Sequence, residues 1–149
     1  MTVDRALVTR KLLLIVRDLD VLSTISSRGA DAYLQNRIDQ AVAERYLERM
    51  VGRMIDVNYH LLTESGHAPP SDYYASFVQL ASLGVLDPAF SQRIAASAGL
   101  RNRIVHEYDE LDHQRIFEAL TSALTDIPAY AAGVEAYLQR LESSTGSNG

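Results

Sequence analysis

The sequence predicts an all-α protein folded as an up-and-down bundle of four or five helices. Apolar residues recur at steps of three and four along almost the whole chain, which is the spacing of one face of a helix. No stretch alternates apolar and polar residues over the length of a strand. Turn-forming residues occur in short clusters, so we expect short connections between long antiparallel helices.

Two long apolar stripes predict the first half of the bundle. The first stripe covers residues 3–26 and is followed by a break at Ser27, Arg28 and Gly29. The second runs from about residue 30 to residue 62, with charged side chains between its apolar positions. We therefore expect one long second helix over residues 30–62.

The middle of the chain contains the clearest loop. Residues 65–70 read SGHAPP, a cluster of turn formers that separates two apolar stripes. Ser71 is of a residue type that caps helices, so we expect it to begin the next helix. That helix should end near Gly84, because glycine is common just after the last helical residue.

A new helix is predicted to begin at Asp87 and Pro88. A capping carboxylate followed by proline at the first helical position is a typical start. The pattern continues towards Gly99, where we expect a bend. Residues 100–108 should then continue as helix.

The last helix and the tail complete a single domain. Asp112 is expected to cap this helix. Pro128 lies inside its apolar pattern and should kink or interrupt it. The predicted domain covers residues 1–142, and residues 143–149, SSTGSNG, are expected to form a disordered tail.

Composition favours a soluble protein of the cytoplasm. Apolar residues make up 47% of the 149 residues, which is typical of a globular domain. The chain has no cysteine, which excludes disulfides, thiolate metal sites and a cysteine nucleophile, and we expect neither metal nor cofactor. The start lacks the pattern of a secretory signal, and the apolar run at residues 12–16 is too short to span a membrane.

The charge balance argues against a broad nucleic-acid-binding surface. Lys and Arg number 14 and Asp and Glu 19, a formal net charge of −5, and Lys11 is the only lysine. A dedicated nucleic-acid binder usually carries a basic face, so DNA is not expected as a partner. A local cleft lined by arginine remains compatible with this balance, because the arginine fork donates two hydrogen bonds to a phosphate. An acidic surface would equally suit a basic protein partner.

Residues 98–112, AGLRNRIVHEYDELD, concentrate the side chains that could do chemistry. Asn102 and His106 are four residues apart and should share a helix face. Arg101 and His106 are five apart, so roughly 140° separates them on a helix. One ideal helix does not aim both at a single phosphate. Either the arginine side chain bends round, or a second copy of the chain completes the site, which leads us to hypothesise a homodimer.

This set of residues suits RNA cleavage without a metal. Histidine can take and give a proton near neutral pH, and RNA supplies its own nucleophile, the 2′-OH. An arginine could stabilise the charge that develops on the phosphate. The structural alternative is that Arg101 pairs with Glu107 or Asp109 and that His106 is a half-buried side chain with its hydrogen bonds satisfied. On that interpretation the protein is a plain helical adaptor.

The full string resembles the R-x4-H-x-Y motif of the HepT-like branch of the HEPN superfamily. Arg101, His106 and Tyr108 occupy the three motif positions, and Asn102 matches the polar residue that the family favours after the arginine. The flanking residues and the helix order are similar as well, over roughly residues 7–141.

This resemblance implies a function and partners. HepT-like proteins are all-α homodimers whose motif helices line a composite cleft, and many are RNase toxins. Carried over, Arg101 would contact phosphate, His106 would be the acid–base, and Asn102 would orient one of them; the substrate would be tRNA or mRNA. An MntA-type nucleotidyltransferase antitoxin would neutralise the toxin by adding AMP to Tyr108. A non-catalytic HEPN module that binds a nucleotidyltransferase or a nucleotide is the alternative.

The remaining histidines do not suggest a metal site. No two of them have the four-residue spacing of a helical metal pair. Asp56 and His60 are four apart, and we interpret them as a hydrogen-bonded pair on one helix face. Arg45 and Glu48 could support the cleft, although a solvated helix face explains them equally well.

Overall fold

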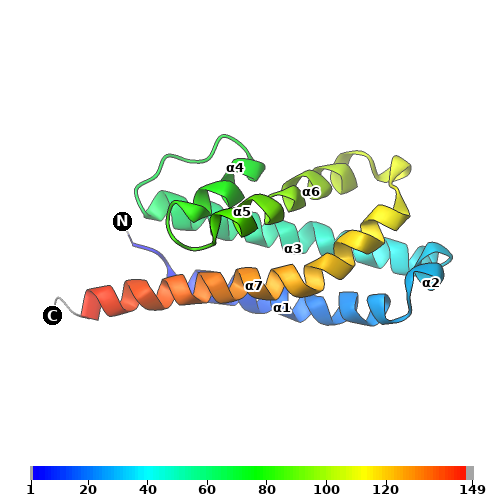
Figure 1. Cartoon of the computed structure of the whole chain (residues 1–149), viewed down its shortest axis with the longest axis horizontal. Helices are drawn as coiled ribbons and strands as arrows, with labels where there is room; N and C mark the ends of the chain where they lie inside the picture. The colour runs from blue at the N-terminus through cyan, green and yellow to red at the C-terminus, as the bar shows by residue number, and fades with distance from the viewer. Residues whose placement is uncertain (1, 147–149) are drawn as a thin grey trace.

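A computed structural model describes residues 2–146, and every regular element in that range is helical. In chain order the elements are α1 Arg5–Ser27, α2 Ala30–Leu34, α3 Arg37–Glu64, α4 Tyr73–Val78, the 3-10 turn η1 Gln79–Ala81, α5 Pro88–Ile94, α6 Ala96–His106, the 3-10 turn η2 Tyr108–Glu110, and α7 His113–Gly146. The long helices α1, α3 and α7 extend along the length of the molecule, and the shorter α4, α5 and α6 lie on one side of this layer (Figure 1). The prediction of an all-α bundle is confirmed.

The expected single helix over residues 30–62 is wrong, because the chain breaks between α2 and α3. Asn36 lies in extended backbone and its side-chain oxygen accepts a hydrogen bond from the Asp39 N–H at 3.0 Å. The Gln40 side chain donates to the Tyr33 carbonyl at 2.9 Å, so it satisfies a group at the end of α2. The Asn36 side chain, which accepts a hydrogen bond, and the Gln40 amide, which donates one, replace the helical hydrogen bonds that the break removes.

The caps of the shorter helices match the predicted ones in part. Asp72 rather than Ser71 caps α4, since its carboxylate accepts from the Ala75 N–H at 2.7 Å. Gly84 ends the segment with a positive φ of 76°, as its position suggested. The predicted start at Asp87 and Pro88 is confirmed, with the Asp87 carboxylate accepting from two N–H groups of α5.

The break between α5 and α6 falls at Ala95, not at Gly99, which lies inside α6. Ile94, Ala95 and Ala98 are all buried, so packing of this corner against the bundle sets the break. α6 ends at His106, two residues earlier than expected, because Glu107 leaves helical geometry with φ −129° and ψ 31°.

α7 is continuous through Pro128, so the proline does not interrupt it. α7 changes direction along its length, with its first turns after η2 inclined to the remainder (Figure 1). The start of α7 is capped by Asp112 as predicted, with hydrogen bonds from Gln114 and Arg115 N–H. The predicted tail is helical over residues 143–146, and residues 147–149 lie outside the described range.

A buried chain of polar side chains joins α7, α3 and α4. The Tyr130 hydroxyl donates to the Asn58 side-chain oxygen at 2.6 Å, and the Asn58 amide donates to the Ser76 hydroxyl at 3.1 Å. All three residues are fully buried. Because buried polar groups are costly without partners, this chain fixes how α4 sits on α3.

α1 and α3 are held together by the buried carboxylate of Asp18. Arg49 donates two hydrogen bonds to it, both of 2.7 Å, and Arg53 donates a third at 2.9 Å. Burial raises the pKa of Asp18, but the hydrogen bond from Arg49 and the charges of Arg49, Arg53 and Arg17 outweigh it, so the pKa is lowered from its ordinary value of 3.8. Asp18 is therefore ionised at neutral pH.

None of the helices within residues 2–146 combines the length and the hydropathy that crossing a bilayer requires.

Candidate active site

The apolar side of α6 anchors the motif to the bundle. Ile104 and Ala98 are buried, and α6 packs on α3, α4 and α5. Leu100 and Leu111 are partly buried against the same core. These contacts hold α6 on the bundle, so Arg101, Asn102 and His106 are presented from a packed backbone.

Arg101 points from α6 into the angle between α3 and α4. Its guanidinium carbon lies 5.4 Å from the centre of the Tyr73 ring, within the range of a cation–π contact. A β-carbon built on Gly52 of α3 would lie 3.8 Å from the Arg101 Nε. This Nε is buried and has no hydrogen-bond partner. Arg101 forms no ion pair with Glu107 or Asp109, so the structural alternative for this residue is wrong.

The other motif residues are exposed and lie apart from Arg101. Asn102 and His106 are on the solvent side of α6. Tyr108 is 66% exposed and lies in η2, beyond the end of α6, so the expected helix over residues 100–108 does not reach it. Among the described residues, no hydrogen bond joins any two of Arg101, Asn102, His106 and Tyr108. The structure therefore shows no direct polar contact among the four motif side chains of one chain.

The Asp56–His60 pair is not formed. The Asp56 carboxylate accepts from the Lys11 ammonium at 3.0 Å, and the His60 Nε2 accepts from the Asp4 N–H at 2.8 Å. Within the described part of the chain, no three His, Asp, Glu or Cys side chains gather as metal ligands would.

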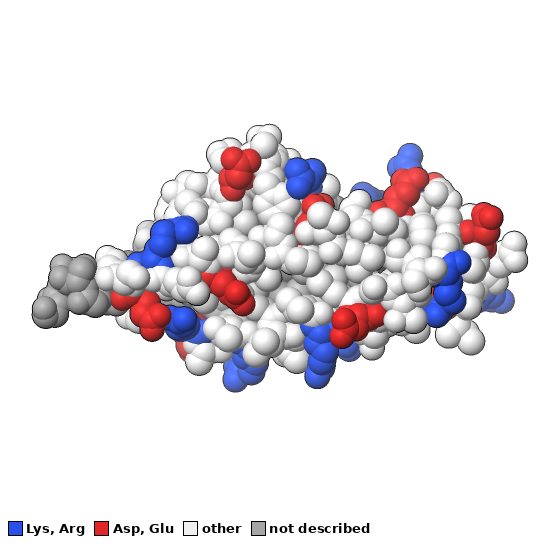
Figure 2. Space-filling model, turned by 60° about the horizontal axis from the view of Figure 1, so that its bottom comes forward, with Lys and Arg blue, Asp and Glu red and all other residues white. Residues whose placement is uncertain are grey.

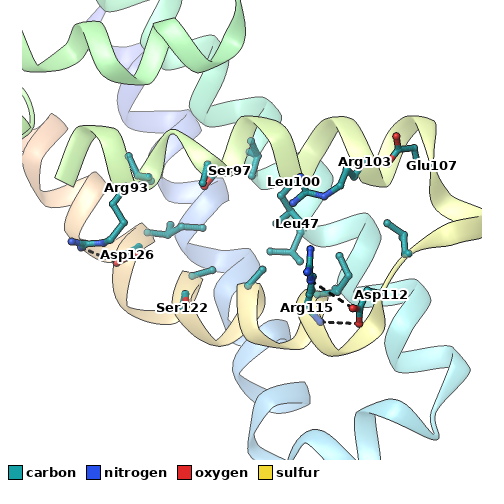
Figure 3. Close-up of a pocket in the computed structure, with 18 of the residues that line it drawn as sticks. Leu47, Arg93, Ser97, Leu100, Arg103, Glu107, Asp112, Arg115, Ser122 and Asp126 are labelled. Atoms are coloured by element: carbon teal, nitrogen blue, oxygen red, sulfur yellow. Dashed lines mark hydrogen bonds and ion pairs between the residues drawn. The ribbon is translucent and has the colours of Figure 1, made fainter. Parts of the chain in front are cut away.

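A cavity of about 440 Å³ lies on the other side of α6, between α6 and α7. Leu47 and Leu100 contribute to its apolar lining (Figure 3). Charged side chains surround the apolar part. Arg93 pairs with Asp126 at 3.3 Å, and Arg115 pairs with Asp112 at 3.6 Å. Arg103 of α6 and Glu107, which follows α6 directly, also line the cavity. None of Arg101, Asn102, His106 and Tyr108 lines this cavity. α6 thus presents the motif and the cavity on different faces.

The face of the molecule in Figure 2 has no continuous basic area. Acidic and basic side chains alternate around it, and its centre is largely free of charge. This agrees with the expectation that the acidic chain lacks a broad basic surface.

Sequence reasoning missed Tyr73 and Gly52, the two residues against Arg101. Both are ordinary helical positions in the sequence, and Tyr73 is 28 residues from Arg101. Tyr73 is 41% exposed, so a large aromatic at the surface beside the motif arginine is a signal that the structure alone provides.

Comparisons with known proteins agree on one family. A family model described as ribonuclease HepT-like matches residues 15–134. The chain is 34% identical over 140 residues to the tRNA nuclease HepT of Aphanizomenon flos-aquae, and the match covers 94% of this chain and 95% of that protein.

Two solved structures share the fold. One is a toxin–antitoxin complex with AMP-PNP, with a TM-score of 0.81 and 21% identity, covering 89% of this chain and 99% of that chain. The other is a tri-AMPylated HEPN toxin of Shewanella oneidensis in complex with MNT antitoxin, with a TM-score of 0.79 and 22% identity. The match covers 87% of this chain and 97% of that chain. The family match over residues 15–134, together with the 34% identical relative, shows that this chain belongs to the HepT-like family.

Proposed function

We propose that this chain is an RNase toxin that cleaves RNA without a metal ion and is neutralised by a nucleotidyltransferase antitoxin of the MntA type. The observation that carries the proposal is Arg101, a half-buried guanidinium with an unpaired Nε, on the same helix as an exposed histidine. A buried donor with no partner in the protein is suited to an acceptor from a ligand. The named relative supports tRNA as the substrate class.

The proposed reaction uses the 2′-OH of RNA as the nucleophile. His106 takes the proton from the 2′-OH, and the 2′-oxygen bonds to the adjacent phosphorus. Arg101 donates to the phosphate oxygens as charge develops on them. The bond from phosphorus to the 5′-oxygen breaks, and His106, now protonated, returns its proton to that oxygen. The products are a 2′,3′-cyclic phosphate and a 5′-hydroxyl end. Asn102, one turn before His106, orients the imidazole or the phosphate.

A homodimer would bring the separated groups together. Arg101 faces α3 and α4, whereas Asn102 and His106 are exposed about 100° and about 140° round the helix from it. A two-fold axis beside α6 would set the His106 of one copy near the Arg101 of the other. We therefore place the active site in a cleft between two copies, where each copy contributes part of the motif.

Tyr108 is the proposed site of AMP addition. Its side chain is 66% exposed, just after the helix that ends at His106, so a transferase can reach the hydroxyl. An added AMP would place a phosphate close to the RNA-binding groups and repel the substrate by like charge. The antitoxin would thus inactivate the toxin covalently.

The test is cleavage of purified tRNA in EDTA by the wild-type protein beside His106→Ala. We expect fragments with cyclic-phosphate ends from the wild type and a loss of at least about 100-fold in the variant, since acid–base catalysis contributes roughly 10² to 10⁴. His113→Ala, which changes a histidine outside the motif, is the control and should keep the activity. Absence of cleavage by unmodified wild-type protein would favour the non-catalytic module that binds a nucleotidyltransferase or a nucleotide.

A further inference from the structure

The outer face of α3 carries three arginines at steps of four residues. Arg45, Arg49 and Arg53 form one ridge, which we term the arginine ridge. Arg45 is exposed, and the side chains of Arg49 and Arg53 are 31% and 23% exposed. The ridge therefore reaches solvent along about two turns of α3.

Two of these guanidinium groups are held in place by a buried carboxylate. Asp18 accepts two hydrogen bonds from Arg49 and one from Arg53 and is itself only 2% exposed. A guanidinium has five N–H donors, so both arginines retain donors that Asp18 does not use. None of the nitrogens of Arg49 or Arg53 is buried without a partner. The Arg49 guanidinium also lies 4.3 Å from the centre of the Tyr46 ring and hydrogen-bonds to Tyr46. The arrangement presents oriented donors without the entropy cost of fixing free side chains.

The ridge has a local excess of positive charge on an acidic chain. Glu48 already pairs with Arg45 at 3.6 Å, and Asp56 pairs with Lys11 at 3.0 Å. Asp18 is shared between two arginines. Arg101, which lies against this helix at Gly52, is paired with no carboxylate. Five cations, Arg45, Arg49, Arg53, Arg101 and Lys11, stand against the three carboxylates Glu48, Asp18 and Asp56, so two cationic charges are left over.

The ridge runs directly to the motif arginine. Gly52 is three residues after Arg49 and one before Arg53, and side chains three apart on a helix are neighbours at about 5–6 Å. Arg101 Nε lies 3.8 Å from the β-carbon position of Gly52. Beyond Arg101, the tyrosines at the start of α4 are exposed, Tyr73 by 41% and Tyr74 by 51%. Exposed aromatic rings beside arginines are the surface on which unpaired bases stack.

We propose that the arginine ridge binds the phosphates of a single-stranded RNA segment that continues from the scissile phosphate at Arg101. This inference rests on the proposed RNase function and adds the path that the substrate takes over the protein. A second copy of this chain is a poor occupant, because a two-fold contact would set two cationic ridges against each other. The neighbouring tyrosines favour RNA over an acidic protein.

The experiment measures binding of a short, fluorescein-labelled single-stranded RNA over a range of salt concentrations. All proteins carry His106→Ala, so that the RNA stays intact. Arg45→Gln and Arg53→Gln are tested singly and together, and Arg49 is left in place to satisfy Asp18. Arg115→Gln is the matched control, since Arg115 pairs with Asp112 three residues away at 3.6 Å, as Arg45 does with Glu48, but lies on α7. Circular dichroism confirms that each variant is folded.

We expect the double variant to weaken binding and to reduce the slope of log K against log salt by about 1.4, because each phosphate contact to a single strand contributes about 0.7. The control should match the parent. If the wild-type protein cleaves RNA but the double variant keeps the parent's salt slope and affinity, the proposal that the ridge binds RNA is wrong. The proposed RNase function is then unaffected. Failure of the parent to bind RNA, together with no cleavage by wild type, would overturn both. If the double variant binds RNA normally but is no longer neutralised by the nucleotidyltransferase, the ridge is a protein interface and the RNA-binding proposal is wrong.

Discussion

Arg101 shows how one side chain can be prepared for an anionic ligand without an ion pair. Its guanidinium lies over Tyr73, and its Nε is buried without an acceptor. An ion pair with Glu107 or Asp109 would neutralise the charge that phosphate binding needs. The aromatic face instead holds the arginine by a weaker contact that leaves its charge available.

Tyr73 should therefore be a positioning residue for Arg101. We expect Tyr73→Leu to lower kcat for RNA cleavage by about 2- to 30-fold, the range of a cation–π contact of about 0.5–2 kcal/mol. Tyr73→Phe retains the ring and should stay close to wild type. Single-turnover cleavage rates measure both variants. Equal losses in the two would show that the hydroxyl, not the ring face, is the important feature.

Asp18 is the residue at which pH should affect stability. Its pKa is lowered in the folded state, so its ion pairs contribute fully at pH values above its ordinary pKa of 3.8. That contribution is lost as the pH falls through the lower, folded-state pKa. We expect Asp18→Asn to cost roughly 2–4 kcal/mol at neutral pH, because it leaves two arginines without their shared carboxylate.

Urea unfolding of wild type and Asp18→Asn at several pH values tests this expectation. The difference in free energy of unfolding should be largest near neutral pH and should shrink below 3.8. Asp20→Asn, on the exposed side of the same helix, is the control and should change little at any pH. A difference that does not depend on pH would contradict the ion-pair account.

Among the elements, α6 is a short helix with separate tasks on different faces. One side packs on α3 and α4 and holds Arg101, another exposes Asn102 and His106, and a third borders the cavity towards α7. The faces are separated because helical residues turn by about 100° each. A ligand in the cavity would therefore touch α6 without touching the motif.

Two helical glycines should respond oppositely to alanine. At Gly133 of α7 an added β-carbon would lie 2.8 Å from the Val85 carbonyl oxygen and 2.9 Å from Leu86, so backbone must shift. At Gly52 of α3 the nearest atom is 3.8 Å away. We expect Gly133→Ala to lose about 1–3 kcal/mol despite its better helix propensity, and Gly52→Ala to gain up to about 1 kcal/mol. Thermal unfolding shows whether each variant is more or less stable than the wild type. A Gly133→Ala variant as stable as the wild type would contradict the close approach of α7 to Val85 and Leu86.

For the whole molecule, the proposed mechanism requires two copies of the chain. Arg101 lies against Tyr73 and Gly52, whereas Asn102 and His106 of the same helix are exposed. Assembly is therefore part of the proposed catalytic mechanism.

The mass in solution checks this requirement. At micromolar concentration we expect light scattering to give twice the mass of the 16.5 kDa chain. Mixing Arg101→Ala with His106→Ala protein should restore part of the RNase activity, because one of the two clefts in a mixed dimer would retain an intact arginine and an intact histidine. A monomeric mass with full activity would contradict the composite cleft.

The sequence by itself determined the fold class, most helix starts and the motif, because these depend on patterns within one or two helical turns. The caps at Asp87 and Asp112 and the apolar anchor of α6 are of this local kind. The break at Asn36 was missed although its cap is also local, since the apolar stripe continues across it.

Only the tertiary structure decided what surrounds the motif. Arg101 meets Tyr73 and Gly52, and Asp18 meets Arg49 and Arg53, which are 31 and 35 residues away. The corner at Ala95 and the cavity between α6 and α7 are likewise products of packing. Periodicity states which side of a helix is apolar but does not state which helix it meets. Contacts between helices follow from the fit of whole surfaces, and those contacts place a cationic ridge beside the motif of an acidic protein.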